Sequence, residues 1–129
     1  MKPKVLVVDD SPTVVKFVAF ALKGGGFEPI AASDGMQALE LVSSLTAPVD
    51  LVITDLNMPN LDGYSLIRAL RENPNYSEVP IIILSSEGAD EDREQGLSAG
   101  ASSYLVKPFK APVLLEEVAK YIKTAECRQ

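Results

Sequence analysis

Hydrophobic and polar positions follow two alternating patterns along the chain. Five short runs rich in valine and isoleucine are separated by longer segments in which apolar residues recur every three or four positions. The short runs predict strands at 4–8, 27–31, 49–54, 79–84 and 103–106. Since each run is followed by a segment with helical spacing, the pattern predicts an α/β fold with one doubly wound sheet of parallel strands.

The apolar content of each run predicts its place in that sheet. The first, third and fourth runs are continuously apolar, which is typical of central strands covered by helices on both faces. The second run contains Glu28 and Pro29, and the fifth begins with the mixed sequence Ser102-Ser103-Tyr104, so both are expected at the edges. Right-handed crossovers then give the strand order 2-1-3-4-5.

Caps and breaks predict where the helices begin and end. Ser11 supplies an N-cap with Pro12 at the first helical position, and Ser33 or Asp34 caps the second helix. The fourth helix contains Gly96 and few large apolar residues, so we expect it to be the least stable element. The expected spans are about 12–23, 34–46, 61–72, 90–99 and 111–124.

Composition narrows the chemistry that the chain can perform. Its 129 residues fit a single domain, 1–129, and leave no room for an output domain. Twelve basic and 18 acidic residues give a net charge of −6, which argues against direct binding of nucleic acid or an anionic membrane. With one cysteine, Cys127, and no long apolar run, a cytoplasmic location is expected. The absence of histidine leaves carboxylates, hydroxyls and amines as the reactive groups.

These reactive groups fall at the carboxyl ends of the expected strands. Asp9 and Asp10 follow the first strand, Asp55 the third, Ser85 the fourth and Lys107 the fifth. Ligands of open α/β sheets bind at this edge, near the switch between strands 1 and 3. Three carboxylates in one crevice repel one another unless a cation lies among them, and oxygen donors suit Mg²⁺, with Mn²⁺ as the alternative. The lysine and the hydroxyl then complete a pocket for a phosphoryl group.

Four ordered blocks of sequence carry a resemblance to a known family. These blocks resemble the signature of the response-regulator receiver domain of two-component signalling, in particular the stand-alone chemotaxis-type (CheY-like) regulators. The resemblance covers essentially the whole chain and implies a flavodoxin-like (βα)5 fold with the same strand order. The blocks are Val5-Leu-Val-Val-Asp-Asp-Ser-Pro12, Asp50-Leu-Val-Ile-Thr-Asp-Leu-Asn-Met-Pro-Asn-Leu-Asp-Gly63, Ile81-Ile-Ile-Leu-Ser-Ser-Glu87 and Gly100-Ala-Ser-Ser-Tyr-Leu-Val-Lys-Pro-Phe109.

The resemblance implies a phospho-acceptor site with a bound metal ion. Asp55 would accept the phosphoryl group from a phosphohistidine of a sensor histidine kinase. Mg²⁺ would be bound by the side chains of Asp10 and Asp55 and by the backbone carbonyl of Asn57, and Asp9 would hold a metal-bound water. The metal would offset the charge between these carboxylates and the phosphoryl oxygens.

The resemblance also implies a switch. Lys107 would contact a phosphoryl oxygen, aimed by a cis peptide bond between Lys107 and Pro108. Ser85 would donate a hydrogen bond to the attached phosphoryl group, and Tyr104 would rotate into the space that the moving loop leaves. The change would be read on the face formed by helix 4, strand 5 and helix 5.

The implied partners are proteins rather than small-molecule substrates. Asn57 and Glu87 would flank the acyl phosphate and tune its hydrolysis, as in the chemotaxis subtype. We expect a monomer that is not an enzyme beyond self-phosphorylation from a phosphodonor and slow autodephosphorylation. Its partners would be a sensor histidine kinase, a phosphatase, and a downstream target such as a flagellar motor switch or another motility protein.

Several alternatives stay open. The chain could act as a phosphate sink, or be a receiver domain cut from a longer regulator. A Mg²⁺ phosphohydrolase using an aspartyl phosphate is less consistent, since Asp-x-Asp after the first strand is absent, and an FMN carrier is disfavoured because Asp9 and Asp10 would repel the FMN phosphate. Phe20 lies beside Lys16, away from the apolar face of its helix, and is interpreted as an aromatic packed against a neighbouring helix or as part of a kinase-docking surface.

Overall fold

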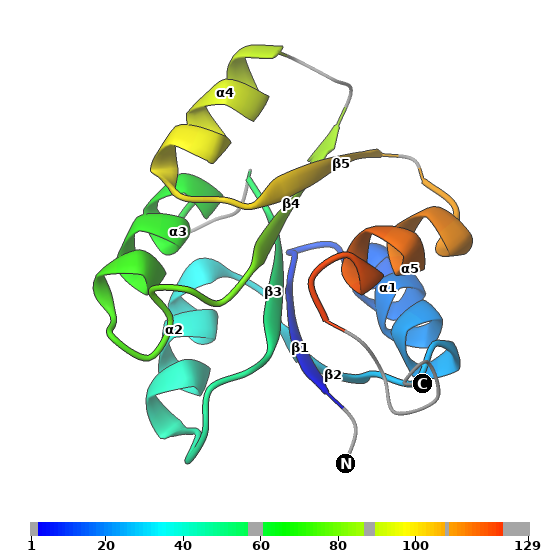
Figure 1. The fold of residues 1–129 in the computed structure, drawn as a ribbon, viewed down its shortest axis with the longest axis horizontal. Coiled ribbons are helices and arrows are strands. Elements are labelled where there is room, and N and C mark those ends of the chain that lie inside the picture. Colours follow the sequence, from blue (N-terminus) through cyan, green and yellow to red (C-terminus); the bar gives the residue numbers. More distant parts are fainter. Residues whose placement is uncertain (1–2, 57–60, 87–89, 108, 123–129) are drawn as a thin grey trace.

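Five strands alternate with five helices in the computed structural model, which describes residues 3–56, 61–86, 90–107 and 109–122 (Figure 1), with the backbone alone for 85–86 and 90–93. The strands are β1 (Lys4–Val8), β2 (Glu28–Ala32), β3 (Leu51–Asp55), β4 (Ile81–Ser86) and β5 (Ser103–Lys107). The helices are α1 (Pro12–Gly24), α2 (Gly35–Ser44), α3 (Gly63–Glu72), α4 (Asp90–Ala99) and α5 (Ala111–Ala119).

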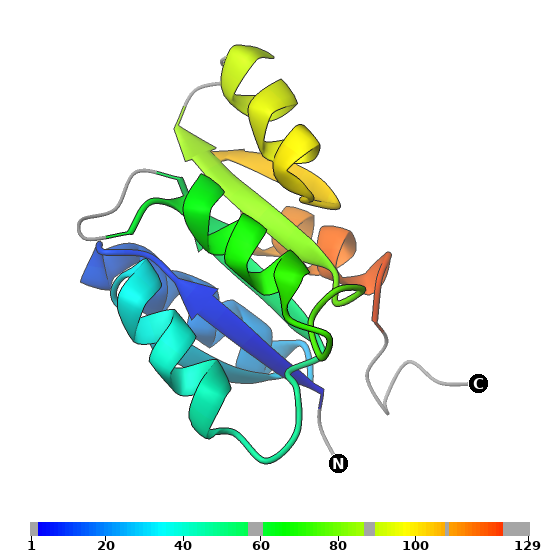
Figure 2. The same cartoon turned by 90° about the vertical axis from the view of Figure 1, so that its left-hand side faces the viewer.

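The five strands form one parallel sheet in the order β2-β1-β3-β4-β5. The doubly wound flavodoxin-like fold is therefore confirmed, with β2 and β5 at the edges as expected. All strands run in the same direction, so their carboxyl ends meet at one edge of the sheet (Figure 2). At that edge Val8 pairs with Thr54, and Asp55 pairs with Leu84.

The sheet separates two hydrophobic cores. Side chains alternate between the faces of a strand, so Leu6 and Val8 of β1 pack on the side of α2 and α3, whereas Val5 and Val7 pack on the side of α1 and α5. Figure 1 shows α1 and α5 together on one side of the sheet and α2, α3 and α4 on the other. Burial on both faces explains why the central runs are continuously apolar.

Helix caps follow the sequence signals, with some differences in length. Asp34, rather than Ser33, caps α2 by accepting from the backbone N–H of Gln37 at 2.8 Å. The helix ends at Ser44 rather than 46, because Leu45 adopts an extended backbone. Helix α5 ends at Ala119 rather than near 124, since the backbone tightens into a turn and Tyr121 donates its hydroxyl hydrogen to the Ser102 carbonyl at 3.3 Å.

Two large apolar side chains, one on α1 and one on α5, are exposed. Phe20 of α1 is 80% exposed, so the prediction that it packs against a neighbouring helix is wrong. Val113 of α5 is 45% exposed because it lies in the first turn of a short helix whose buried residues are Leu114 and Val118. Both exposed side chains belong to the helices that cover the α1 and α5 side of the sheet.

Helix α4 has the span expected from the sequence, and its described side chains contribute little to the core. Gly96 is buried against Ile83 of β4, and Leu97 is 38% exposed. The chain just after the helix is held by Arg71 of α3, which donates from Nε to the Gly100 carbonyl at 2.8 Å. Burial lowers the pKa of Arg71. Within the described part of the chain, no helix combines the length and apolar character needed to cross a bilayer.

Candidate functional site

The alternation of side chains along the strands brings a cluster of charged groups to one edge of the sheet. Asp9, Asp55 and Lys107 each stand two residues after a buried side chain that faces α1 and α5. Side chains two residues apart along a strand point to the same face of the sheet. Each charged side chain is therefore expected on the same face as the buried side chain two residues before it. The three preceding side chains are Val7, Ile53 and Leu105.

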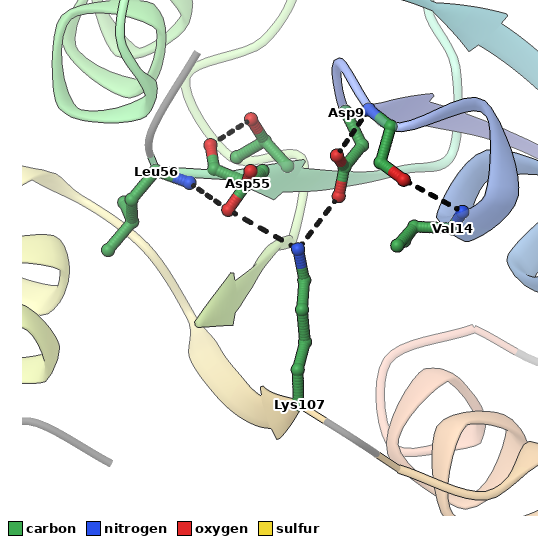
Figure 3. A network of polar contacts seen from close by, with 7 residues as sticks. Asp9, Val14, Asp55, Leu56 and Lys107 are labelled. Carbon is green, nitrogen blue, oxygen red and sulfur yellow. Dashed lines mark hydrogen bonds and ion pairs between the residues drawn. The ribbon is translucent and has the colours of Figure 1, made fainter. Parts of the chain in front are cut away.

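Lys107 is the cation of this cluster and lies between two carboxylates (Figure 3). Its Nζ is 3.0 Å from Oδ2 of Asp9 and 3.6 Å from Oδ1 of Asp55. Asp9 is only 1% exposed and Asp55 is 7% exposed, so both carboxylates would carry a large desolvation cost without a partner. The ammonium group therefore offsets part of the repulsion between them.

Backbone N–H groups fix the orientation of both buried carboxylates. Oδ1 of Asp55 accepts a hydrogen bond from the Leu56 N–H at 2.8 Å, and Oδ1 of Asp9 accepts from the Ser11 N–H at 2.9 Å (Figure 3). The hydroxyl of Thr54, which is fully buried, donates to the backbone carbonyl of Asp55 at 2.9 Å. The two N–H bonds to the carboxylates involve a charged acceptor and are therefore stronger than bonds between neutral groups. They hold the side chains of Asp55 and Asp9 in defined rotamers.

Three carboxylates are close enough together to bind one cation. Asp9, Asp10 and Asp55 each offer an oxygen, and these oxygens all lie within 4.8 Å of one another. Lys107 offsets only one of the three negative charges. Oxygen donors with a residual negative charge fit a small divalent ion such as Mg²⁺. Asp10 is exposed and gives that site a side open to solvent.

Of the other residues predicted from the sequence to act at the site, the structure describes Tyr104 and the backbone of Ser85. Ser85 lies in β4 and pairs through its backbone with Val106, next to Lys107. Tyr104 is partly buried in β5 and packs against the core on the α2 and α3 side. The side chain of Ser85 lies outside the described part of the structure, as do three whole residues: Asn57, Glu87 and Pro108. The carbonyl ligand, the hydrolysis-tuning pair and the cis peptide bond therefore remain predictions.

An apolar hollow beside Lys107 was not foreseen from the sequence. It has a volume of about 340 Å³ and is lined by Thr13, Val14, Phe17, Lys107 and Phe109. The Phe17 and Phe109 rings lie 5.8 Å apart, and Phe17 is 41% exposed although it stands one helical turn before the buried Ala21. The spacing gives the direction of a side chain on α1, but the short α5 covers only part of that face.

The sequence from residue 5 to residue 119 matches the family model described as "Response regulator receiver domain". The chain belongs to the response-regulator receiver family. Receiver domains are phosphorylated by sensor histidine kinases and lose the phosphoryl group slowly without help. The resemblance seen in the four sequence blocks is thereby confirmed.

Two curated relatives show how the receiver domain occurs in proteins of different length. The chain is 45% identical over 118 residues to the transcriptional regulatory protein PrrA of Mycobacterium tuberculosis, covering 92% of this chain and 48% of PrrA. It is 35% identical over 122 residues to the chemotaxis protein CheY1 of Helicobacter pylori, covering 94% of this chain and 98% of CheY1. The chain therefore spans about half of the first relative and nearly all of the second.

A solved structure shows the same fold together with a metal ion. The receiver domain of sensor histidine kinase PA1611 from Pseudomonas aeruginosa PAO1 superposes with a TM-score of 0.85 at 32% identity, covering 94% of this chain and 98% of that one. That structure contains a magnesium ion coordinated in its active-site cleft. Receiver domains bind Mg²⁺ at an acidic pocket, and the acidic pocket of this chain is formed by Asp9, Asp10 and Asp55.

Proposed function

We propose that Asp55 accepts a phosphoryl group from the phosphohistidine of a sensor kinase. The observation that carries this assignment is the position of Asp55 at the end of a central strand, with Lys107 at 3.6 Å and carboxylate oxygens of Asp9 and Asp10 within 4.8 Å. Asp9 is a weaker candidate, since it is 1% exposed and lies closer to Lys107. We assign Asp9 to holding a metal-bound water, and Asp10 and Asp55 to direct binding of Mg²⁺, with the backbone carbonyl of Asn57 as a further ligand.

The proposed transfer is a substitution at phosphorus. A carboxylate oxygen of Asp55 forms a bond to phosphorus, the bond from phosphorus to the histidine nitrogen breaks, and its electron pair returns to the imidazole. Mg²⁺, when bound, neutralises charge between the carboxylates and the incoming phosphoryl oxygens. The N–H of Leu56 holds the Asp55 carboxylate in place during the approach. Lys107, freed from part of its pairing with Asp9, binds a phosphoryl oxygen.

We propose that the kinase docks over the apolar hollow beside Lys107. The hollow opens next to the acceptor site and is lined by Phe17 and Phe109, so an apolar side chain of the partner can fill it. Phe20 stands one helical turn from Phe17 and is 80% exposed, which extends the apolar surface along α1. This exposure supports the assignment of Phe20 to the docking surface.

The proposed output is a change in the face formed by α4, β5 and α5. Ser85 would bind the attached phosphoryl group and draw the end of β4 toward it, and Tyr104 would move in response. The weak attachment of α4, in which Gly96 is the one buried residue among residues 94–99, suits an element that changes position. Similarity to CheY1 along nearly its whole length supports a role in chemotaxis or motility control.

A second candidate function has its own support. PrrA is a transcriptional regulatory protein of about twice this length, so the same receiver sequence could work inside a longer regulator. The two proposals differ in the target that the phosphorylated chain binds. A pull-down with the phosphorylated chain that recovers a flagellar motor switch or another motility protein supports the first. Recovery of a transcription-related protein favours the second.

The acceptor assignment is tested by the intact mass of the protein after incubation with acetyl phosphate and Mg²⁺. We expect one phosphoryl adduct on the wild type and none on Asp55→Asn. Asp50→Asn is the matched control, since it makes the same change on an exposed residue just before the opposite end of β3, and it should be phosphorylated like the wild type. An adduct on Asp55→Asn, or no adduct on the wild type under varied donor concentrations, contradicts the proposal.

A further inference from the structure

Two glycines at the beginnings of helices lie against the chain that follows Asp55. Gly35 is the first residue of α2, and Gly63 is the first residue of α3. The described glycines with positive φ are Gly26 and Gly100, so the backbone conformation at Gly35 and Gly63 is open to any residue. What glycine provides at these two positions is space.

Gly63 is packed against the backbone of the proposed acceptor. A Cβ atom at this position would collide with the carbonyl oxygen of Asp55 and would lie 2.7 Å from Cα of Leu56. In addition, the Gly63 N–H donates to the Leu56 carbonyl at 2.9 Å. Backbone atoms cannot rotate away as the end of a side chain can, so any side chain at 63 displaces the backbone at 55–56 or breaks this hydrogen bond.

Gly35 lies against Leu61, which follows the segment 57–60 in the chain. A Cβ atom here would lie 2.6 Å from the carbonyl oxygen of Leu61 and 2.8 Å from its Cβ. Leu61 is partly buried and packs against the core on the α2 and α3 side, so moving it outward would remove apolar surface from that core. Asp62, the next residue, accepts from the Ser65 N–H at 2.8 Å and fixes the start of α3.

We infer that Gly35 and Gly63 are positioning residues for the acceptor site. By letting the first turns of α2 and α3 approach this closely, they fix Asp55 and Leu56 on one side and Leu61 on the other. These residues bound the segment 57–60, which contains Asn57, the proposed carbonyl ligand of Mg²⁺. The inference rests on the proposed function, because it assigns the glycines to the geometry of that site.

A change of Gly to Ala separates this role from ordinary folding effects. Alanine is the better helix former, so the replacement of a helical glycine where space is open is neutral or stabilising. Gly24 is such a position, since a Cβ atom there would meet nothing within 4 Å. Gly24→Ala is therefore the matched control for Gly35→Ala and Gly63→Ala.

The experiment measures the rate of phosphorylation by acetyl phosphate across a Mg²⁺ titration. Each variant is assayed at a temperature at which circular dichroism shows it fully folded, so that loss of stability alone leaves the result unchanged. For Gly63→Ala we expect the Mg²⁺ concentration at half-maximal rate to rise about tenfold, or the maximal rate to fall about tenfold. For Gly35→Ala we expect a change of about threefold in the same direction, and for Gly24→Ala less than about twofold.

The outcomes are distinguishable. If the wild type is phosphorylated on Asp55 and both Gly35→Ala and Gly63→Ala stay within about twofold of it, the inference is overturned while the proposed function stands. If the wild type is not phosphorylated on Asp55, the proposed function itself fails. If Gly63→Ala does not fold, Gly35→Ala decides by the same criterion, since its contact is with Leu61 and not with the acceptor.

Discussion

Lys107 has two neighbours in this structure, and the nearer one is not the proposed acceptor. Its ammonium group lies 3.0 Å from Asp9 and 3.6 Å from Asp55. That the ends of four strands carry carboxylates, a hydroxyl and an amine could be predicted from the sequence, because the apolar runs fix where each strand stops. The partners of Lys107 and the N–H donors of Leu56 and Ser11 could not, because they depend on rotamers and on the twist of the sheet.

Replacing Lys107 tests its role as the cation that offsets repulsion among buried carboxylates. We expect Lys107→Met to lower the free energy of unfolding by about 1–3 kcal/mol without Mg²⁺, since a buried charge loses its partner. Saturating Mg²⁺ should remove most of this loss, because the metal supplies the missing positive charge. Urea denaturation with and without Mg²⁺ measures both quantities, and a loss that Mg²⁺ leaves unchanged contradicts this role.

Lys120 offers a matched control for Lys107→Met. Its Nζ lies 3.0 Å from Glu117, but the lysine side chain is 61% exposed, so we expect a negligible effect from Lys120→Met. The hydrogen bond from Lys120 to Glu117 raises the pKa of the lysine. Any stabilisation from this pair is therefore fully present below the ordinary lysine pKa and is lost only as the pH rises through the raised value. A neutral buffer therefore leaves the pair of Lys120 and Glu117 intact.

At the scale of the elements, Arg71 joins three parts of the chain on the side away from the acceptor site. Besides the Gly100 carbonyl, its guanidinium donates to the carbonyls of Tyr76 at 2.9 Å and Val79 at 2.7 Å. These bonds tie α3 to the loop before β4 and to the turn after α4. The end of α4 near Gly100 is therefore fixed, while the proposed movement concerns the opposite end.

Because a lysine cannot reproduce the planar fork of a guanidinium, we expect Arg71→Lys to lower the free energy of unfolding by about 2–3 kcal/mol. Arg68→Lys, on the exposed face of the same helix, should change it by less than about 0.5 kcal/mol. Urea denaturation of both variants makes the comparison. Equal changes in the free energy of unfolding at the two positions would contradict the claim that the three carbonyl contacts of Arg71 stabilise the fold.

The element boundaries show which local signals are reliable. Helix α1 begins at Pro12 after its Ser11 cap, and α4 spans Asp90–Ala99, as expected. Helix α2 was expected to be longer than it is, and the hydroxyls of Ser43 and Ser44 at its end donate to backbone carbonyls one turn back, a local alternative to continued helix. The exposure of Phe20 depends on how far a neighbouring helix reaches, which no pattern within α1 contains.

For the whole molecule, the fold class and strand order could be predicted because burial on both faces makes the central strands continuously apolar. The net charge of −6 is a poor guide by itself, since it hides the gathering of Asp9, Asp10 and Asp55 at one edge. Their closeness is a property of the folded chain. In the unfolded chain Asp55 lies far from the other two, so a cation that needs all three binds the folded state and stabilises it.

We therefore expect Mg²⁺ to raise the free energy of unfolding by about 2.7 kcal/mol at a concentration one hundred times its dissociation constant. K⁺ at the same ionic strength should not reproduce the effect, because screening alone does not require three ligands. Asp10→Asn should lose most of the gain, whereas Asp50→Asn should keep it. Thermal denaturation followed by circular dichroism measures the gain, and equal stabilisation by K⁺ would argue against a specific site.

The position of the phosphoryl group tests the central claim most directly. An acyl phosphate is reduced by borohydride to an alcohol, so a phosphorylated aspartate becomes homoserine and can be located by peptide mass mapping. After treatment with a phosphodonor and Mg²⁺, we predict homoserine at position 55 and unchanged aspartate at positions 9 and 10. Homoserine at position 9 or 10 would contradict the account. So would unreduced aspartate at position 55 in protein that carried the phosphoryl mass before the reduction.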